Sequence, residues 1–243
     1  MTSGGDRRDE LAAGLRDVHR RIAAAAARVG RDPADITLVV VTKTYPATDV
    51  LLLAELGVRD IGENRHPESR DKAAAVSTSL GDDAEPLRWH FVGGLQTNKA
   101  AAVADYADLV HSVDRTRLVA ALARGASRRG RIVRCLVQVD LDPEGPRPGR
   151  SGATPANVPA LADLIAAESA LQLGGVMAVA PLDSHPRVAF ERLLAVANRM
   201  REEHPGATDI SAGMSGDLEA AIEVGATHVR VGRAVLGERP PLG

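Results

Sequence analysis

The sequence predicts a single α/β domain, a (β/α)8 TIM barrel with an additional N-terminal helix, and three observations support this prediction. Short apolar segments alternate with amphipathic segments along the chain, which indicates parallel strands joined by helical crossovers. Eight strand-like segments occur in 243 residues, a length that suits a closed barrel. No linker, repeat or change in composition marks a second domain. We therefore expect residues 1–8 to be disordered and residues 9–243 to form one barrel.

The first unit is the clearest one. Leu11, Leu15 and Val18 begin a series of apolar residues at spacings of three and four, so residues 9–29 are expected to form an amphipathic helix on the outside of the barrel. The following segment, 36–42, is apolar on both faces, as expected for a fully buried parallel strand.

The remaining units follow in the same order. Thr48 is expected to cap the second helix, and Gly57 to end it. The other expected strands lie at 59–62, 88–92, 109–112, 132–139, 171–178, 208–211 and 228–231. The other expected helices lie at 49–56, 67–77, 97–106, 114–127, 157–168, 186–203 and 217–224. No clear helix is expected after the last strand.

The composition argues against several classes of function. The net charge of −2 gives no general attraction to nucleic acid or membranes, and an aromatic content of 2% is too low for base-stacking surfaces. One cysteine, Cys135, excludes an internal disulfide framework, and the scattered histidines predict no metal site. The N-terminus has no apolar targeting segment, and no stretch is long enough to span a membrane. We expect a cytoplasmic, monomeric protein.

Lys43 is the most informative single residue, because it directly follows the buried strand at 36–42. Lysine is seldom buried unless it is paired or functional, and this chain has only 3 lysines against 27 arginines. A buried amine with a lowered pKa is what imine chemistry requires. The alternative is that Lys43 simply extends from the strand end into solvent.

Further candidate residues lie in or near the ends of the other expected strands. The carboxyl ends of the strands form the functional face of such barrels, so these residues are candidates for one common site. They are Glu63 and Asn64, His90, His111 and Asp114, Asp140, Met177, Met214, Ser215 and Gly216, and Arg230 and Gly232.

The last two units predict a phosphate site. Barrels often bind phosphate with the loops after the seventh and eighth strands and with a helix N-terminus. Ser215 lies in a loop of small residues immediately before an expected helix, and Gly232 would let the backbone approach a ligand closely. Either glycine-containing loop alone is compatible with a plain turn. Together with Lys43, they predict a phosphorylated ligand that also forms an imine.

These motifs resemble those of the pyridoxal 5′-phosphate (PLP) homeostasis protein family. The resemblance extends from about residue 10 to residue 239 and implies a fold type III PLP-binding barrel, similar to the N-terminal domain of alanine racemase. It implies PLP as cofactor, bound covalently to Lys43 as a Schiff base. The motifs are Val41-Thr42-Lys43-Thr44 with Pro46, Gly62-Glu63-Asn64, Trp89–Lys99, His111–Arg115, Gly175–Ala178, Gly213–Asp217 and Val229–Gly232.

The resemblance also implies the roles of six further residues. They are Arg230 at the pyridine nitrogen, Asn64 and Met214 along the ring, and Ser215, Gly232 and the Arg233 backbone amide at the phosphate. A cation at the pyridine nitrogen disfavours its protonation and weakens the ring as an electron sink. This suits a carrier better than broad carbanion chemistry.

Several positions depart from the family pattern. The 140–152 loop ends without the usual lysine, which puts any role of a second lysine there in doubt. Arg233 replaces a small residue, so its side chain would change the surroundings of the phosphate. The other departures are Pro67, Gly94 and Asp140.

Three functions fit these observations. The leading hypothesis is a PLP carrier without catalytic turnover, which controls the PLP supply and hands PLP to PLP-dependent apoenzymes. The second is an amino-acid racemase, which needs acid/base groups on both faces of the ligand. Only Tyr45 and Tyr106 are available as tyrosines and the chain ends soon after the last strand, which favours the carrier. The third is an aldolase that uses a lysine imine and a phosphate site without a cofactor.

Overall fold

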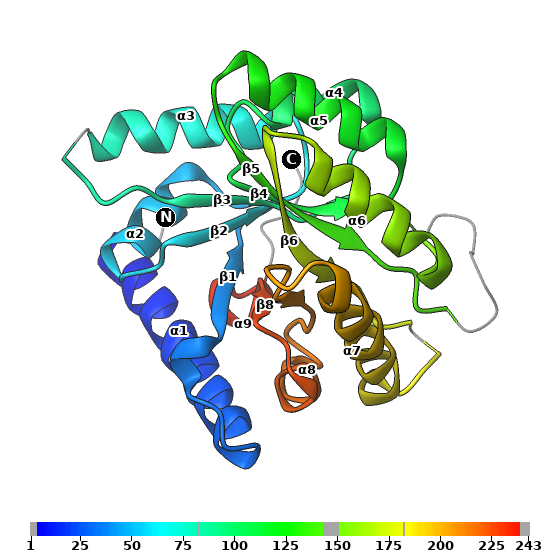
Figure 1. Cartoon of the computed structure of the whole chain (residues 1–243). Coiled ribbons are helices and arrows are strands. Elements are labelled where there is room, and N and C mark those ends of the chain that lie inside the picture. Colours follow the sequence, from blue (N-terminus) through cyan, green and yellow to red (C-terminus); the bar gives the residue numbers. More distant parts are fainter. Residues whose placement is uncertain (1–3, 82, 143–150, 182, 239–243) are drawn as a thin grey trace.

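The computed structural model describes residues 4–81, 83–142, 151–181 and 183–238. Eight parallel strands close into a barrel in sequential order, and helices surround it, which confirms the predicted (β/α)8 fold (Figure 1). The strands are β1 (Thr37–Val41), β2 (Asp60–Glu63), β3 (Arg88–Phe91), β4 (Leu109–Val113), β5 (Val133–Gln138), β6 (Leu171–Met177), β7 (Asp209–Ser211) and β8 (His228–Val231). The α-helices are α1 (Gly4–Arg28), α2 (Ala47–Glu55), α3 (Glu68–Leu80), α4 (Thr97–Val103), α5 (Thr116–Arg128), α6 (Val158–Ala167), α7 (Pro186–Glu203), α8 (Leu218–Val224) and α9 (Arg233–Leu236), with short 3-10 helices at Pro33–Asp35 and Pro155–Asn157.

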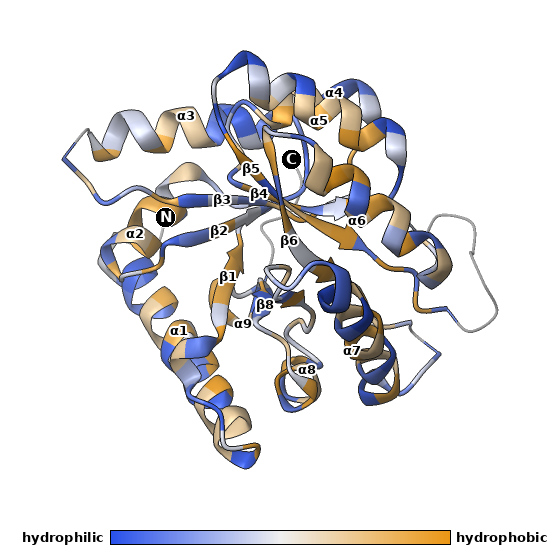
Figure 2. Ribbon diagram, viewed as in Figure 1, coloured by the Kyte–Doolittle hydropathy of each residue, from blue (hydrophilic) through white to orange (hydrophobic). Residues whose placement is uncertain are grey.

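Helix α1 packs on the outside of the barrel, as its periodicity predicts. Leu11, Leu15, Val18 and Ile22 are each at most 4% exposed and belong to one core cluster with residues of β1 and β8. Polar and apolar residues alternate along the outer helices, whereas β1 is mainly apolar (Figure 2). The hydrophobic effect therefore fixes the apolar faces of the helices against the strands.

Two predictions about the ends of the first helices are wrong. Helix α1 begins at Gly4, so the disorder expected for 1–8 does not hold for 4–8, and residues 1–3 lie outside the described part. Arg7 explains the longer helix, because its guanidinium contacts Asp49 Oδ2 of α2 at 2.6 Å. Helix α2 begins at Ala47 with Pro46 as its N-cap, so Thr48 is not the cap.

A helix that the sequence does not predict follows β8. Helix α9 has only 4 residues, too few for a recognisable period. It packs closely against α1, where a Cβ added to Gly14 would lie 2.5 Å from the Val235 carbonyl oxygen. This contact requires a glycine in α1, and it places the first turn after β8 against the N-terminal helix.

Candidate functional site

Lys43 lies immediately after β1, at the carboxyl end of the barrel, and is half-buried. The residues on both sides of it are held by hydrogen bonds. The Thr42 amide donates to the Gly62 carbonyl at 2.9 Å, and the Thr42 hydroxyl donates to the Glu63 carboxylate at 2.7 Å. The Tyr45 hydroxyl donates to the Gly237 carbonyl at 2.8 Å. The loop that carries Lys43 is therefore fixed to β2 on one side and to the end of α9 on the other.

The backbone next to Lys43 is strained. Thr44 has a φ of 70° and is the one non-glycine residue with a positive φ among the described ranges. A β-branched residue in this left-handed conformation costs roughly 1–3 kcal/mol, and such strain persists only where the surroundings enforce it. A turn bond from the Tyr45 amide to the Thr42 carbonyl, at 3.0 Å, closes the loop around it. The strained turn therefore fixes the direction in which the chain leaves Lys43.

Lys72 also reaches this loop, although no sequence pattern predicts a role for it. Its ammonium group donates to the Thr42 carbonyl at 2.8 Å and forms an ion pair with Glu63, and its side chain is 12% exposed. The amine of Lys72 is thus engaged in holding the loop. Glu63 stood out as a strand-end residue, but nothing in the sequence connects it with a lysine nine positions later, because the two belong to different elements.

The loop after β7 is held by α1. The Arg21 guanidinium donates to the Ser215 carbonyl at 2.9 Å and forms an ion pair with Glu219 at 2.6 Å. The Met214 amide donates to Asp217 Oδ1 at 2.6 Å, which closes the loop on itself. Ser215 is half-buried, and Met214 is 40% exposed. Both side chains therefore lie on a loop whose backbone is fixed from two directions.

The loop after β8 lies between the loops after β7 and β1. The Arg230 amide donates to the Gly213 carbonyl at 2.9 Å, which joins β8 to the Ser215 loop. A Cβ added to Gly232 would lie 3.2 Å from the Val41 carbonyl oxygen, so this backbone approaches the end of β1 closely. Helix α9 begins at the next residue, Arg233, whose side chain is exposed.

The strand order now explains how the candidate residues come together. Strands β7, β8, β1 and β2 are consecutive neighbours in the closed barrel. The predicted residues follow these four strands or lie within them. They are Met214 and Ser215 after β7, Arg230 in β8 with Gly232 and Arg233 after it, Lys43 after β1 and Asn64 after β2. The structure thus brings the candidate residues to one sector of the barrel.

Arg230 is the charged group at the inner wall of this sector, and it is 5% exposed. Its guanidinium donates to the Ser211 hydroxyl at 2.6 Å and to the Ala178 carbonyl at 2.9 Å. Burial lowers the pKa of Arg230 to about 10, and the negative charge of Asp217 partly offsets this effect. Arg230 therefore remains a cation at neutral pH.

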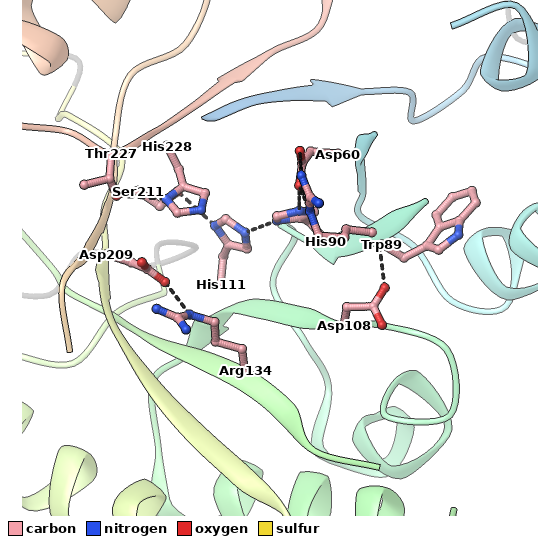
Figure 3. Close-up of polar contacts among 11 residues, drawn as sticks. Asp60, Trp89, His90, Asp108, His111, Arg134, Asp209, Ser211, Thr227 and His228 are labelled. Carbon is pink, nitrogen blue, oxygen red and sulfur yellow. Dashed lines mark hydrogen bonds and ion pairs between the residues drawn. The ribbon is translucent and has the colours of Figure 1, made fainter. Parts of the chain in front are cut away.

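Three histidines occupy the barrel interior next to Arg230. His90 lies between Asp60 and His111, and His111 contacts Ser211, each at 2.9 Å (Figure 3). The ring centroid of His228 lies 6.3 Å from those of both His90 and His111. His90 and His111, which were expected among the strand-end residues, lie within β3 and β4, with their side chains buried.

Comparison with known proteins identifies the type of barrel. Residues 15–240 match the family model described as the alanine racemase N-terminal domain. The pyridoxal phosphate homeostasis protein of Mycobacterium tuberculosis is 42% identical over 244 residues, which cover 96% of this chain and 95% of the relative.

Two solved structures agree with this match. An unknown protein from Bifidobacterium adolescentis is 29% identical with a TM-score of 0.85, and the match covers 97% of each chain. The structure of PipY from Synechococcus elongatus with PLP bound is 32% identical with a TM-score of 0.75, and the match covers 89% of this chain and 100% of PipY.

Fold and site together thus define a barrel of the alanine racemase N-terminal type. The chain belongs to the pyridoxal phosphate homeostasis protein family. This confirms the resemblance that the sequence motifs carry. In the part of the chain that the structure describes, no helix is long and apolar enough to cross a membrane. Across the same residues, no three His, Cys, Asp or Glu side chains are grouped so that they could hold a metal ion.

The buried histidines predict that the fold is sensitive to acid. The pKa of His228 is lowered to about 4, mainly because burial disfavours its charged form, and burial likewise holds the pKa of His111 well below its usual value. Below pH of about 6.5, the unfolded chain binds protons that these folded histidines do not. The free energy of unfolding should therefore decrease as the pH falls from about 6.5 towards 4.

A His228→Asn variant tests this prediction. Its free energy of unfolding should decrease less steeply over this range, by up to about 1.4 kcal/mol per pH unit. Urea denaturation at a series of pH values measures the slope. His19→Asn, on the exposed side of α1, is the matched control and should keep the original slope. Equal slopes for both variants would show that His228 does not contribute to acid sensitivity.

Proposed function

We propose that this chain binds PLP at the sector formed by β7, β8, β1 and β2, carries it as a Schiff base on Lys43, and serves PLP homeostasis without catalytic turnover of its own. The single observation that supports this most is the convergence of a strand-end lysine, a buried cation and two close-packed loops in one sector. The PLP-bound structure of a relative with 32% identity supports the choice of ligand. PLP-dependent apoenzymes would receive the PLP, and the carrier would act as a monomer.

The residues present fit PLP. Its aldehyde needs an amine, and Lys43 supplies one from a fixed loop at the end of β1. Its phosphate needs hydrogen-bond donors on closely approaching backbone, which the loops at Ser215 and Gly232 can supply. Bound PLP would supply an aldehyde and an electron-withdrawing ring. The chain itself would bind and orient it, with Asn64 and Met214 along the ring and the Arg233 amide at the phosphate.

Arg230 fits the pyridine nitrogen in such a carrier. A permanent cation at that position opposes protonation of the nitrogen, because two like charges would then meet in a buried site. An unprotonated ring withdraws electrons less strongly. This favours storage of PLP over carbanion chemistry.

The tyrosines of the chain are poorly placed to act as a second acid/base group. The Tyr45 hydroxyl donates to the Gly237 carbonyl. The Tyr106 hydroxyl lies 2.5 Å from the Ser69 hydroxyl, and burial raises its pKa to about 12. Racemization needs a proton donor and acceptor on opposite faces of the ligand. These contacts therefore favour a carrier over the racemase alternative.

The attachment site is tested by borohydride reduction and mass spectrometry. Protein incubated with PLP should show a visible absorbance band that borohydride removes, and the pyridoxyl adduct should map to Lys43. Lys43→Ala should lose the adduct and remain folded, because the half-buried side chain at a strand end is not part of the hydrophobic core. Lys99→Ala is the matched control and should keep the adduct. A stoichiometric adduct on Lys72 or Lys99 would refute the assignment.

The phosphate site is tested by comparing two ligands. Ser215→Ala should weaken PLP binding more than pyridoxal binding, because only PLP carries the phosphate. A hydrogen bond to a charged group contributes about 1.5–3 kcal/mol, or roughly one to two decades in the dissociation constant. Met214→Ala is the control, since a ring contact should affect both ligands alike. Equal losses for both ligands in Ser215→Ala would place that residue elsewhere.

The absence of turnover is tested by deuterium exchange at Cα of alanine in heavy water, with chiral analysis of the product. A missing acid/base group typically lowers the rate by about 10²–10⁴-fold. We expect negligible racemization by PLP-loaded protein. Turnover on the order of 1 s⁻¹ or faster, an ordinary enzymatic rate, would contradict the carrier proposal and favour the racemase.

A further inference from the structure

A continuous chain of hydrogen bonds crosses the barrel interior and ends at Arg230. His90 Nε2 lies 2.9 Å from Asp60 Oδ1, and His90 Nδ1 lies 2.9 Å from His111 Nε2. His111 Nδ1 lies 2.9 Å from the Ser211 hydroxyl, which accepts from Arg230 at 2.6 Å. These five side chains belong to residues that are at most 6% exposed. Figure 3 shows the hydrogen-bonded side chains of Asp60, His90, His111 and Ser211.

The donor at one end of this hydrogen-bond chain and the acceptor at the other are compatible with one direction for every link. Arg230 can only donate, so the Ser211 oxygen accepts from it, and the hydroxyl proton of Ser211 is available to His111 Nδ1. His111 then carries its proton on Nε2 and donates to His90 Nδ1. His90 in turn carries its proton on Nε2 and donates to the Asp60 carboxylate, which can only accept. In this direction both imidazoles are in the Nε2–H form.

The electrostatics of the Asp60 end support this direction. Burial alone would raise the pKa of Asp60, but its hydrogen bonds with His90 and Arg88 outweigh that effect and lower the pKa to about 2. Asp60 is therefore a carboxylate at neutral pH. The neutral form assigned to His111 agrees with the lowering of its pKa by burial and by the nearby Arg230 cation.

The aligned chain stabilises the buried cation. Arg230 donates to two neutral oxygens, and a buried charge needs compensation from hydrogen bonds or opposite charge. Each link of the chain turns its negative end towards Arg230 and its positive end towards Asp60. Hydrogen bonds in series also polarise one another. The chain thus connects the Arg230 cation to the Asp60 anion across the barrel.

We propose that Asp60, His90, His111 and Ser211 are positioning residues that hold the Arg230 guanidinium at the inner wall of the site and so keep the ring nitrogen that it faces unprotonated. The part of this inference that concerns the ring rests on the proposed function. The direction of the chain and the histidine tautomers do not depend on it. The electronic state of the bound ring is thereby controlled from the opposite end of the barrel.

Other charged and titratable groups surround the Asp60 end of the chain. Arg88 forms an ion pair with Asp60, and His228 faces both histidines across the interior. Asp209 pairs with Arg134 at 2.6 Å (Figure 3). Asp209 is 8% exposed and is an acidic residue like Asp60, but its carboxylate pairs with Arg134, which lies outside the five hydrogen-bonded side chains, so it offers a matched control.

Nitrogen-15 NMR of the histidine rings in the ligand-free protein tests the chain directly. We expect His90 and His111 to show the signals of the neutral Nε2–H tautomer at pH 7. A charged ring or an Nδ1–H tautomer at either residue would overturn the proposed direction. This measurement uses the unmodified chain, so it holds even where a variant fails to fold.

The effect on the site is tested with PLP-loaded Asp60→Asn and with Asp209→Asn as control. Without the Asp60 carboxylate the hydrogen-bond chain should no longer hold the Arg230 cation against the ring nitrogen. The nitrogen should then protonate more easily, and the pH midpoint of the visible absorbance change should rise by about one unit, the size of shift that a nearby charge produces. Asp209→Asn should keep the original midpoint. Equal midpoints for both variants would overturn the positioning role. If the unmodified protein forms no borohydride-sensitive band, the proposed function fails instead, while the NMR result still decides the direction of the chain.

Discussion

Placing the Arg230 guanidinium inside the barrel constrains much of this structure, because an uncompensated buried cation would be strongly destabilising. Its side chain donates hydrogen bonds to the Ser211 hydroxyl and the Ala178 carbonyl, and its backbone amide donates to the Gly213 carbonyl. The interior histidines continue these contacts to Asp60. Arg230 therefore connects β7, β8 and the residue after β6 to the loop proposed for the phosphate. Packing, electrostatics and the geometry of the site all depend on this one side chain.

Helices outside the barrel fix the loops around the site in place. Helix α1 contributes Arg21 to the Ser215 loop and Gly14 to the contact with α9. Helix α3 contributes Lys72 to the loop that carries Lys43. The N-terminal helix is therefore part of the support of the site as well as a cover for the hydrophobic core. A fixed loop restricts the directions available to Lys43, which is the kind of pre-organisation that binding sites need.

Hydropathy alone allowed the barrel to be predicted, because its periodicity is local: the alternation of buried strands and amphipathic helices is present in each unit. The position of Lys43 could be predicted for the same reason, since it directly follows a buried strand. The role of Lys72 and the series of hydrogen bonds between Asp60 and Arg230 could not be predicted. Their contacts join residues up to 100 positions apart and depend on the register of the closed barrel. Helix α9 was missed because 4 residues carry no period.

The proposed site requires the buried Arg230 cation to face the ring nitrogen of PLP. Nitrogen-15 NMR of the unmodified protein loaded with PLP labelled at the pyridine nitrogen measures this most directly. At pH 7 we expect the chemical shift of an unprotonated pyridine nitrogen, without coupling to a directly bonded proton. The shift of a protonated pyridinium nitrogen would contradict it, because Arg230 would then not be positioned against the ring.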